Sequence, residues 1–222
     1  MVDPRVIHSI TIEACTGFLL LAGAAVIVKL ASDWWLRSLR GRSARLDRWA
    51  ISASKFAEPA SYFALIAGVI ATFVSMVTGS LAWPASQLVA SETVHNKILV
   101  TSVSQTLFIG AILLRARYRF EIWMSRGTGL SYAALVLTGD ALMTLQNSIA
   151  GHLAGKGSLL DDMLHILGIN THPMWVYPAW ASLLILIAFP ISAAVAGLVL
   201  RRGRMAPGPG GAPGGGESKP SA

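Results

Sequence analysis

The stretch that decides the fold is ITIEACTGFLLLAGAAVIVKLA, residues 10–31, in which apolar side chains predominate over 22 residues. A transmembrane helix needs about 20 such residues, because the hydrocarbon core of a bilayer is about 30 Å thick. Four more apolar runs of similar length follow along the chain, at residues 60–82, 94–114, 129–150 and 176–200. Because lipid offers no hydrogen-bond partner to open backbone, the sequence predicts an all-α polytopic membrane protein with five transmembrane helices.

The composition supports a membrane-embedded chain. Of the 222 residues, 54% are hydrophobic and 13% are charged, whereas a soluble domain carries about 25% charged residues. We expect residues 1–204 to form one membrane domain. Residues 205–222 are mostly glycine, proline and small polar residues, so we expect a disordered cytoplasmic tail there, because such a composition cannot bury an apolar core.

The basic residues indicate the orientation of the chain. Fifteen of the 18 lysines and arginines lie in the connections after the first and third runs, at the end of the first run, or near the C-terminus. Since positive residues stay on the cytoplasmic side, the N-terminus is expected outside and the C-terminus inside. The net charge of +7 is thus a topology signal. We expect the basic residues to contact the lipid bilayer and its anionic headgroups. We do not expect nucleic acid as a partner. We expect the protein in a bacterial plasma (inner) membrane.

Two connections are expected to form helices on the membrane surface. In the first basic connection, tryptophans and leucines alternate with arginines, which predicts a helix lying in the membrane interface. In the last connection, Leu159 to Leu167 follow helical spacing, and Gly168 is a plausible stop. This second helix should lie on the outer surface with His165 on its polar side.

The histidines point to a cofactor site at the outer face. His8, His95 and His152 open or close three different helices at similar depth. Cofactor sites in helix bundles are built from facing helices, and both haem iron and copper accept imidazole. The sequence therefore predicts that these three histidines hold haem b or copper. Each histidine taken alone is better explained as an interfacial residue.

A further set of candidate metal ligands lies in the connection before the fifth run. His165, His172 and Met174 combine imidazole with thioether, which favours copper or haem over magnesium or calcium. Their spacing matches no standard metal motif. They are therefore secondary candidates to the three helix-end histidines.

Polar side chains inside the apolar runs form a second group of candidate site residues. They are Glu13, Gln105, Asp140 and Asn147. Asp140 lies near the middle of its run, where an ionised group costs several kcal/mol unless it is partnered. It is either a protonated or hydrogen-bonded packing element, which is the preferred interpretation, or part of a proton or ion route.

Four quoted segments resemble a family of small bacterial membrane proteins known as domain of unknown function 2231. They are VIHSITIEACTGFLLLAGAAVIVKLASDWW, ALIAGVIATFVSMVTGSLAW, TVHNKILVTSVSQTLFIGAILLRAR and ALVLTGDALMTLQNSIAGHLAGKGS, and the resemblance covers about residues 5–157. His8, Gly79, His95, Arg115 and Gly151 occupy the family's characteristic places. The chain departs from the family in three ways. Ser9 stands where the family usually has proline, the second helix lacks the family's acid, and the fifth apolar run is extra. The resemblance implies a four-helix membrane core and an association with Rieske-type redox modules.

Three functions remain open from the sequence. The first is a haem b- or copper-binding subunit of a membrane electron-transfer assembly, with other membrane subunits or an extracytoplasmic redox protein as partners. The second is a cofactor-free scaffold or assembly subunit of a membrane complex. The third is proton or ion transport using Asp140, which ranks lowest because five spans leave no paired repeats for alternating access. The sequence names no catalytic residue and does not decide whether the protein is an enzyme.

Overall fold

The computed structural model describes residues 4–153, 159–169 and 180, and within these ranges it contains helices and no strand. Four helices are long and apolar enough to cross a membrane. They are α1 (Pro4–Ser38), α2 (Ala44–Ala82), α4 (Glu92–Tyr118) and α5 (Arg126–Leu153). These helices contain the first four predicted spans, which confirms the all-α membrane class. The predicted fifth span at 176–200 and the predicted tail at 205–222 lie outside the described residues.

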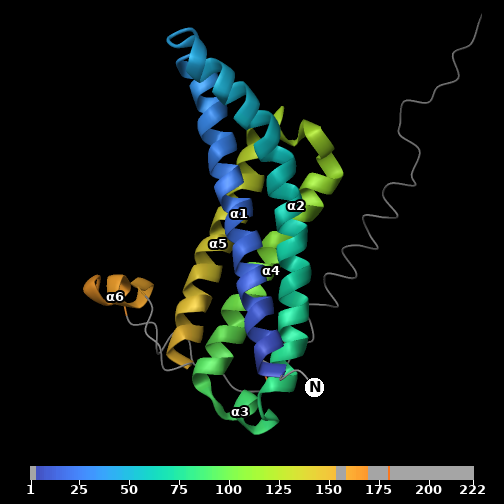
Figure 1. Cartoon of the computed structure of the whole chain (residues 1–222), viewed down its shortest axis with the longest axis vertical. Coiled ribbons are helices and arrows are strands. Elements are labelled where there is room, and N and C mark those ends of the chain that lie inside the picture. The colour runs from blue at the N-terminus through green and yellow to red at the C-terminus, as the bar shows by residue number, and fades with distance from the viewer. Residues whose placement is uncertain (1–3, 154–158, 170–179, 181–222) are drawn as a thin grey trace, which may run out of the picture.

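The four long helices form an antiparallel bundle (Figure 1). α1 packs beside α2 and α5, and α4 packs beside α5 and α2. We call the end where α1 and α4 begin, near His8 and His95, the histidine end. The opposite end, where α1 joins α2 and α4 joins α5, is the arginine end. Three short helices lie at the connections: α3 (Ala85–Ala90), η1 (Arg119–Trp123) and α6 (Leu159–Ile166).

The centre of the bundle is filled with apolar side chains. Leu19, Leu65, Phe108 and Val136 come from the four different long helices, and all four are fully buried. Glycine lets these helices approach closely, since a Cβ at Gly68 would lie 2.6 Å from the side chain of Leu19. Small residues at helix contacts are typical of membrane bundles, because packing and not the hydrophobic effect holds helices together in lipid.

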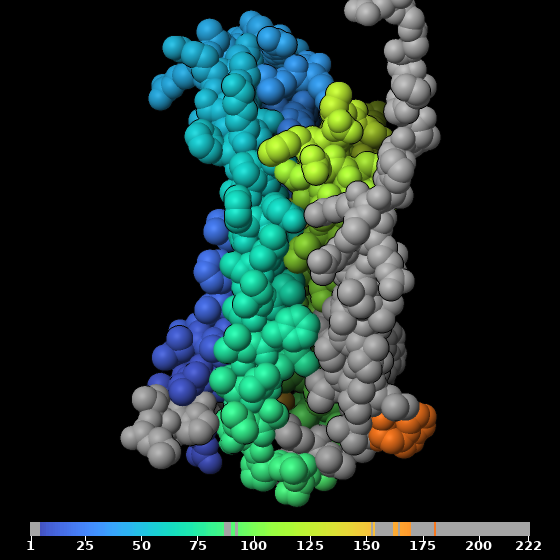
Figure 2. All heavy atoms as spheres, turned by 90° about the vertical axis from the view of Figure 1, so that its right-hand side faces the viewer, coloured from blue at the N-terminus to red at the C-terminus, as the bar shows by residue number. Residues whose placement is uncertain are grey.

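The first basic connection differs from its prediction. α1 continues to Ser38 and α2 already begins at Ala44, so the two helices extend past the ends of α4 and α5 as one hairpin (Figure 1). The predicted separate interfacial helix is therefore wrong. We call residues 32–56 the arginine hairpin. Figure 2 shows the tip of this hairpin standing beyond η1 in the space-filling view.

One aspartate explains why the hairpin replaces an interfacial helix. Asp47 accepts a hydrogen bond of 2.9 Å from the Trp35 indole N–H and another of 2.9 Å from the backbone N–H of Gly41. Gly41 has a φ of 90°, which suits glycine because it lacks a Cβ. Ser43 then caps α2 by accepting from the backbone N–H of Leu46. These bonds hold the turn closed and keep both helices packed.

The helix predicted in the last connection is confirmed as α6, and its place on the outer membrane surface stays a prediction. It ends at Ile166, and Gly168 follows with a φ of 73° and donates its backbone N–H to the carbonyl of His165 at 2.9 Å. A left-handed glycine after the last helical residue is a common helix stop. The side chain of His165 is exposed.

Candidate functional site

The arginine end contains a buried ion pair between two long helices. Glu58 of α2 and Arg115 of α4 are each 7% exposed, and the Arg115 Nε donates to the Glu58 carboxylate. Charged side chains are rarely this buried unless they are paired, because removing an ion from water costs several kcal/mol. The pair therefore joins the two hairpins of the bundle at a defined point.

Aromatic rings surround the ion pair. The guanidinium carbon of Arg115 lies 4.7 Å from the ring centroid of Phe120 and 5.2 Å from that of Tyr62. Both distances fall within the range of cation–π attraction. One turn after Glu58, the hydroxyl of Ser61 donates to the Glu58 carbonyl at 2.8 Å and shares a buried hydrogen bond of 3.1 Å with the hydroxyl of Tyr132. The pair thus has little freedom to rearrange.

A second polar cluster lies at the base of the arginine hairpin. The ammonium of Lys29 donates to the Asp33 carboxylate and to the Ser54 hydroxyl, each at 2.8 Å. Ser54 in turn donates to Asp33 at 2.8 Å. The same ammonium lies 5.3 Å from the ring centroid of Trp123 in η1. This cluster fixes α1 against α2 and brings η1 close to both.

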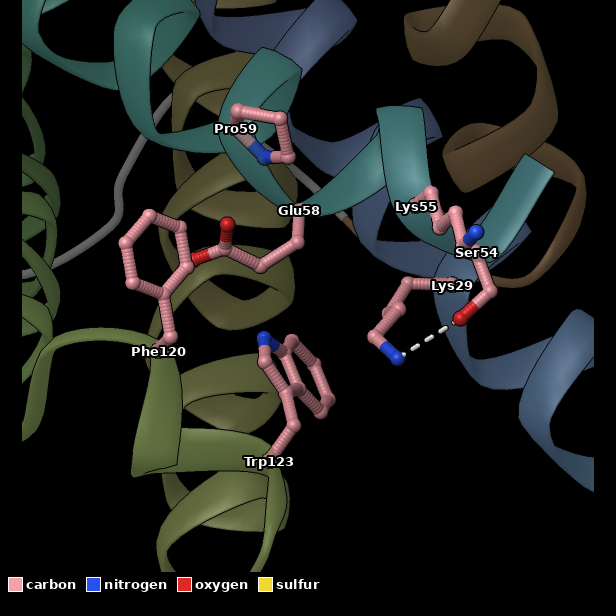
Figure 3. Close-up of a pocket in the computed structure, with 7 residues that line it drawn as sticks. All are labelled: Lys29, Ser54, Lys55, Glu58, Pro59, Phe120 and Trp123. Carbon is pink, nitrogen blue, oxygen red and sulfur yellow. Dashed lines mark hydrogen bonds between the residues drawn. The ribbon is translucent and has the colours of Figure 1, made fainter. Parts of the chain in front are cut away.

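A pocket of about 310 Å³ opens between the two polar clusters. Figure 3 shows its lining residues, with Glu58, Phe120 and Trp123 facing one another and Lys29 bonded to Ser54. The full lining set is Lys29, Ser54, Lys55, Glu58, Pro59, Phe120 and Trp123. The indole Nε1 of Trp123 is buried and has no hydrogen-bond acceptor among the residues that the structure describes. The pocket therefore offers a donor without a partner.

The helix-end histidines lie at one end of the bundle, as their sequence positions indicate. The His8 Nδ1 and the Thr78 hydroxyl share a hydrogen bond of 3.3 Å, and the imidazole ring packs against Gly79. His95 is 5% exposed at the start of α4. His152 lies on the last turn of α5, and its side chain is outside the described residues. The haem or copper site expected from these three histidines therefore stays a prediction.

Among the side chains that the structure describes, no group of three or more histidine, cysteine, aspartate or glutamate residues is placed to hold a metal. His165 points to solvent on α6. His172 and Met174 lie outside the described residues. The predicted metal set of His165, His172 and Met174 therefore also stays a prediction.

Three of the four intramembrane polar residues face other helices. Gln105 is buried and donates to the Thr72 hydroxyl of α2 at 3.2 Å. Asn147 donates to the Thr16 hydroxyl of α1 at 3.3 Å. Glu13 differs, because its side chain is exposed on the surface of the bundle. Hydrogen bonds between helices, each contributing about 1 kcal/mol in lipid, are one way in which membrane bundles hold together.

Asp140 packs against α1 at the position of Gly23. A Cβ at Gly23 would overlap the carboxyl group of Asp140, so glycine leaves the space that the carboxyl fills. The Asp140 Oδ1 is buried without a hydrogen-bond partner in the part of the chain that the structure describes. The close fit to Gly23 supports the packing interpretation of this residue.

Sequence reasoning missed the Glu58–Arg115 pair. The two residues are 57 positions apart and lie in different helices, so no local motif marks them. In the sequence, Arg115 stands out only as one of the cytoplasmic basic residues and as a place shared with the resembled family. The signal that could have found the pair is the single acid directly before Pro59, at the entrance to an apolar run and with Tyr62 one turn later.

The fold defines the class of the protein as an all-α bundle with four helices of membrane-spanning length and composition. No protein-family model, no curated protein and no solved structure matches the chain. The resemblance to domain of unknown function 2231 therefore stays a prediction.

Proposed function

We propose that the protein is an assembly subunit of a membrane complex, and that its arginine hairpin docks an acidic surface of a partner subunit in the cytoplasm. The orientation follows from the one-sided distribution of basic residues, with the N-terminus outside. The bundle then serves as the anchor and the hairpin as the docking arm. No cofactor takes part in this role.

The observation that carries the proposal is a set of exposed arginines on a structured hairpin. Five arginines are exposed there, and none forms an ion pair with the residues that the structure describes: Arg37, Arg40, Arg42, Arg45 and Arg48. Together with two aspartates they give residues 33–48 a formal net charge of +3. Arginine pairs with carboxylates through two parallel hydrogen bonds, which makes it the favoured cation at protein interfaces.

The structure of the hairpin supports a docking role for its arginines in addition to their role in setting the membrane orientation. A topology signal requires only basic residues close to the helix ends. Here α1 and α2 have 35 and 39 residues, far more than the roughly 20 that a bilayer requires. From Lys29 to Ser38, α1 rises about 14 Å at 1.5 Å per residue, which carries the arginines clear of the hydrocarbon core.

The interior of the bundle supports an anchoring role over transport. Apolar side chains from all four helices fill its centre, and the Asp140 carboxyl fills the space that Gly23 leaves. A transport site at the midplane usually has broken helices around it, whereas α5 runs unbroken from Arg126 to Leu153. Electron transfer through haem b or copper on the histidines ranks second. Absorption spectra of the purified protein, oxidised and reduced, separate that function from the anchoring role.

Photo-crosslinking from the hairpin tests the docking role. A photo-reactive amino acid in place of Arg40 should give one discrete protein adduct in native membranes. Adding the substitutions Arg37→Gln and Arg48→Gln should reduce the adduct about tenfold, because two exposed ion pairs together contribute about 1.4 kcal/mol. The adduct should also weaken as salt is raised, since exposed charges are screened.

The matched control places the same photo-reactive group at Val77, which is 61% exposed on the apolar surface of α2. This position should give no adduct of the same mass. An adduct from residue 40 that is unchanged by the two glutamine substitutions and by salt would contradict the docking role, as would the absence of any adduct.

A further inference from the structure

We infer that the pocket between η1 and the base of the arginine hairpin binds the phosphate headgroup of an anionic phospholipid, in the leaflet at the arginine end. The pocket lies at the right depth for this ligand. Lys29 lines it and stands near the end of the first apolar run, at 10–31. A run of this length spans the hydrocarbon core, so its end lies at the headgroup level.

The pocket provides the donors that a phosphate anion requires. The Trp123 indole N–H is buried and lacks an acceptor among the described residues, and an indole nitrogen can only donate. A buried donor without an acceptor costs about 1–3 kcal/mol, which a phosphate oxygen would recover. Lys55 lines the same pocket, is exposed, and forms no ion pair with any described residue.

The charges around the pocket favour one added negative charge. Lys29 is neutralised by Asp33, and Glu58 is neutralised by Arg115. Lys55 is then the uncompensated cation of the lining set. A phosphodiester carries one negative charge and would balance it. Basic pockets between membrane helices on the cytoplasmic side are typical binding sites for anionic headgroups.

The size and the rim of the pocket favour a lipid over free phosphate. Its volume of about 310 Å³ is at the lower end of the range for small-molecule pockets, about 300–1,000 Å³, which suits a headgroup and not a whole lipid. Beside it, Phe120 is 76% exposed and Met124 is 83% exposed. Apolar side chains at a membrane boundary are suited to contact acyl chains, which would anchor the bound lipid.

Native mass spectrometry of the purified full chain tests the site. We expect one dioleoyl phosphatidylglycerol to bind more tightly than dioleoyl phosphatidylcholine. Lys55→Gln should weaken this binding about fivefold, the effect of one basic residue at an anionic headgroup. Trp123→Phe should weaken it about tenfold, because it removes a hydrogen bond to a charged group. The phenylalanine keeps a ring for the contacts with Lys29 and Tyr132.

Two control variants lie outside the pocket and outside the set of five docking arginines. Arg117→Gln removes an exposed cation at the end of α4 and Trp49→Phe removes an exposed indole, and both should leave the affinity for phosphatidylglycerol unchanged. Equal binding of the two lipids would overturn the proposal. So would unchanged affinity in Lys55→Gln, whose exposed side chain can be removed without disturbing the fold. Competition by glycerol phosphate at the same concentration as the lipid would assign the pocket to free phosphate and overturn it as well.

Discussion

Replacing Glu58 by glutamine should lower the free energy of unfolding by about 3–5 kcal/mol, because it leaves the buried charge of Arg115 without a counter-ion. The guanidinium cannot escape to water easily, since both members of the pair are 7% exposed and aromatic rings flank the arginine. The loss should appear in unfolding titrations of the purified protein in mixed micelles, and as a lower yield of folded protein in membranes.

The double variant Glu58→Leu/Arg115→Met should regain most of this stability, because apolar residues of similar size often replace a buried ion pair at little cost. Glu121→Gln is the matched control, since Glu121 is exposed on η1 and forms no ion pair with a described residue. That change should stay within about 0.5 kcal/mol. A loss below about 1 kcal/mol for Glu58→Gln would show that the pair does not hold α2 to α4.

Replacing Gly23 by alanine should destabilise the bundle by about 1–3 kcal/mol, because the added methyl group overlaps the carboxyl of Asp140, which then has to leave the space that it fills between α1 and α5. The Oδ1 of the same carboxyl is buried without a hydrogen-bond partner among the described residues, so packing against Gly23 holds the carboxyl in place. Unfolding titrations measure the effect under the same conditions as for Glu58.

Gly17→Ala provides the control on the same helix. A Cβ at Gly17 meets nothing within 4 Å, so this variant should be neutral or slightly stabilised, as alanine favours a helix over glycine by about 1 kcal/mol. Adding Asp140→Gly to Gly23→Ala should restore much of the lost stability by emptying the space. Failure of that rescue would contradict the packing role of Asp140.

The long helices could be predicted from the sequence because bilayer thickness fixes their length. Each apolar run from 10–31 to 129–150 maps onto one helix, and lipid permits no other local structure for such a run. α6 was predictable for a different reason. Its apolar spacing and the left-handed Gly168 specify a short helix and its end within ten residues.

The arginine hairpin and the buried pair could not be predicted from local patterns. An amphipathic segment rich in tryptophan and arginine fits an interfacial helix equally well until Asp47 is seen to bond both Trp35 and Gly41. The partner of Glu58 depends on how α2 and α4 lie side by side, which is a property of the bundle. A single sequence carries no information on such long-range pairs.

The sequence predicts a functional site at the histidine end, whereas the structure places the strongest candidate features at the arginine end. The histidine pattern predicts a cofactor site at the histidine end. There, His8 contacts Thr78 and Gly79 of α2. The arginine end combines the exposed arginines, the buried pair and the pocket beside Trp123. Docking and lipid binding both require that this end lies at a membrane boundary, with the hairpin outside the bilayer.

The position of the hairpin relative to the membrane is the central claim, and labelling of single cysteines in intact cells tests it most directly. Cys15, which is buried, is first replaced by alanine. Arg42→Cys then reports the hairpin tip and Ser86→Cys reports α3 at the histidine end; both positions are exposed. We predict that a membrane-impermeant maleimide labels residue 86 in intact cells and labels residue 42 only after the membrane is permeabilised. Labelling of residue 42 in intact cells, or no labelling of it after permeabilisation, would contradict a cytoplasmic hairpin.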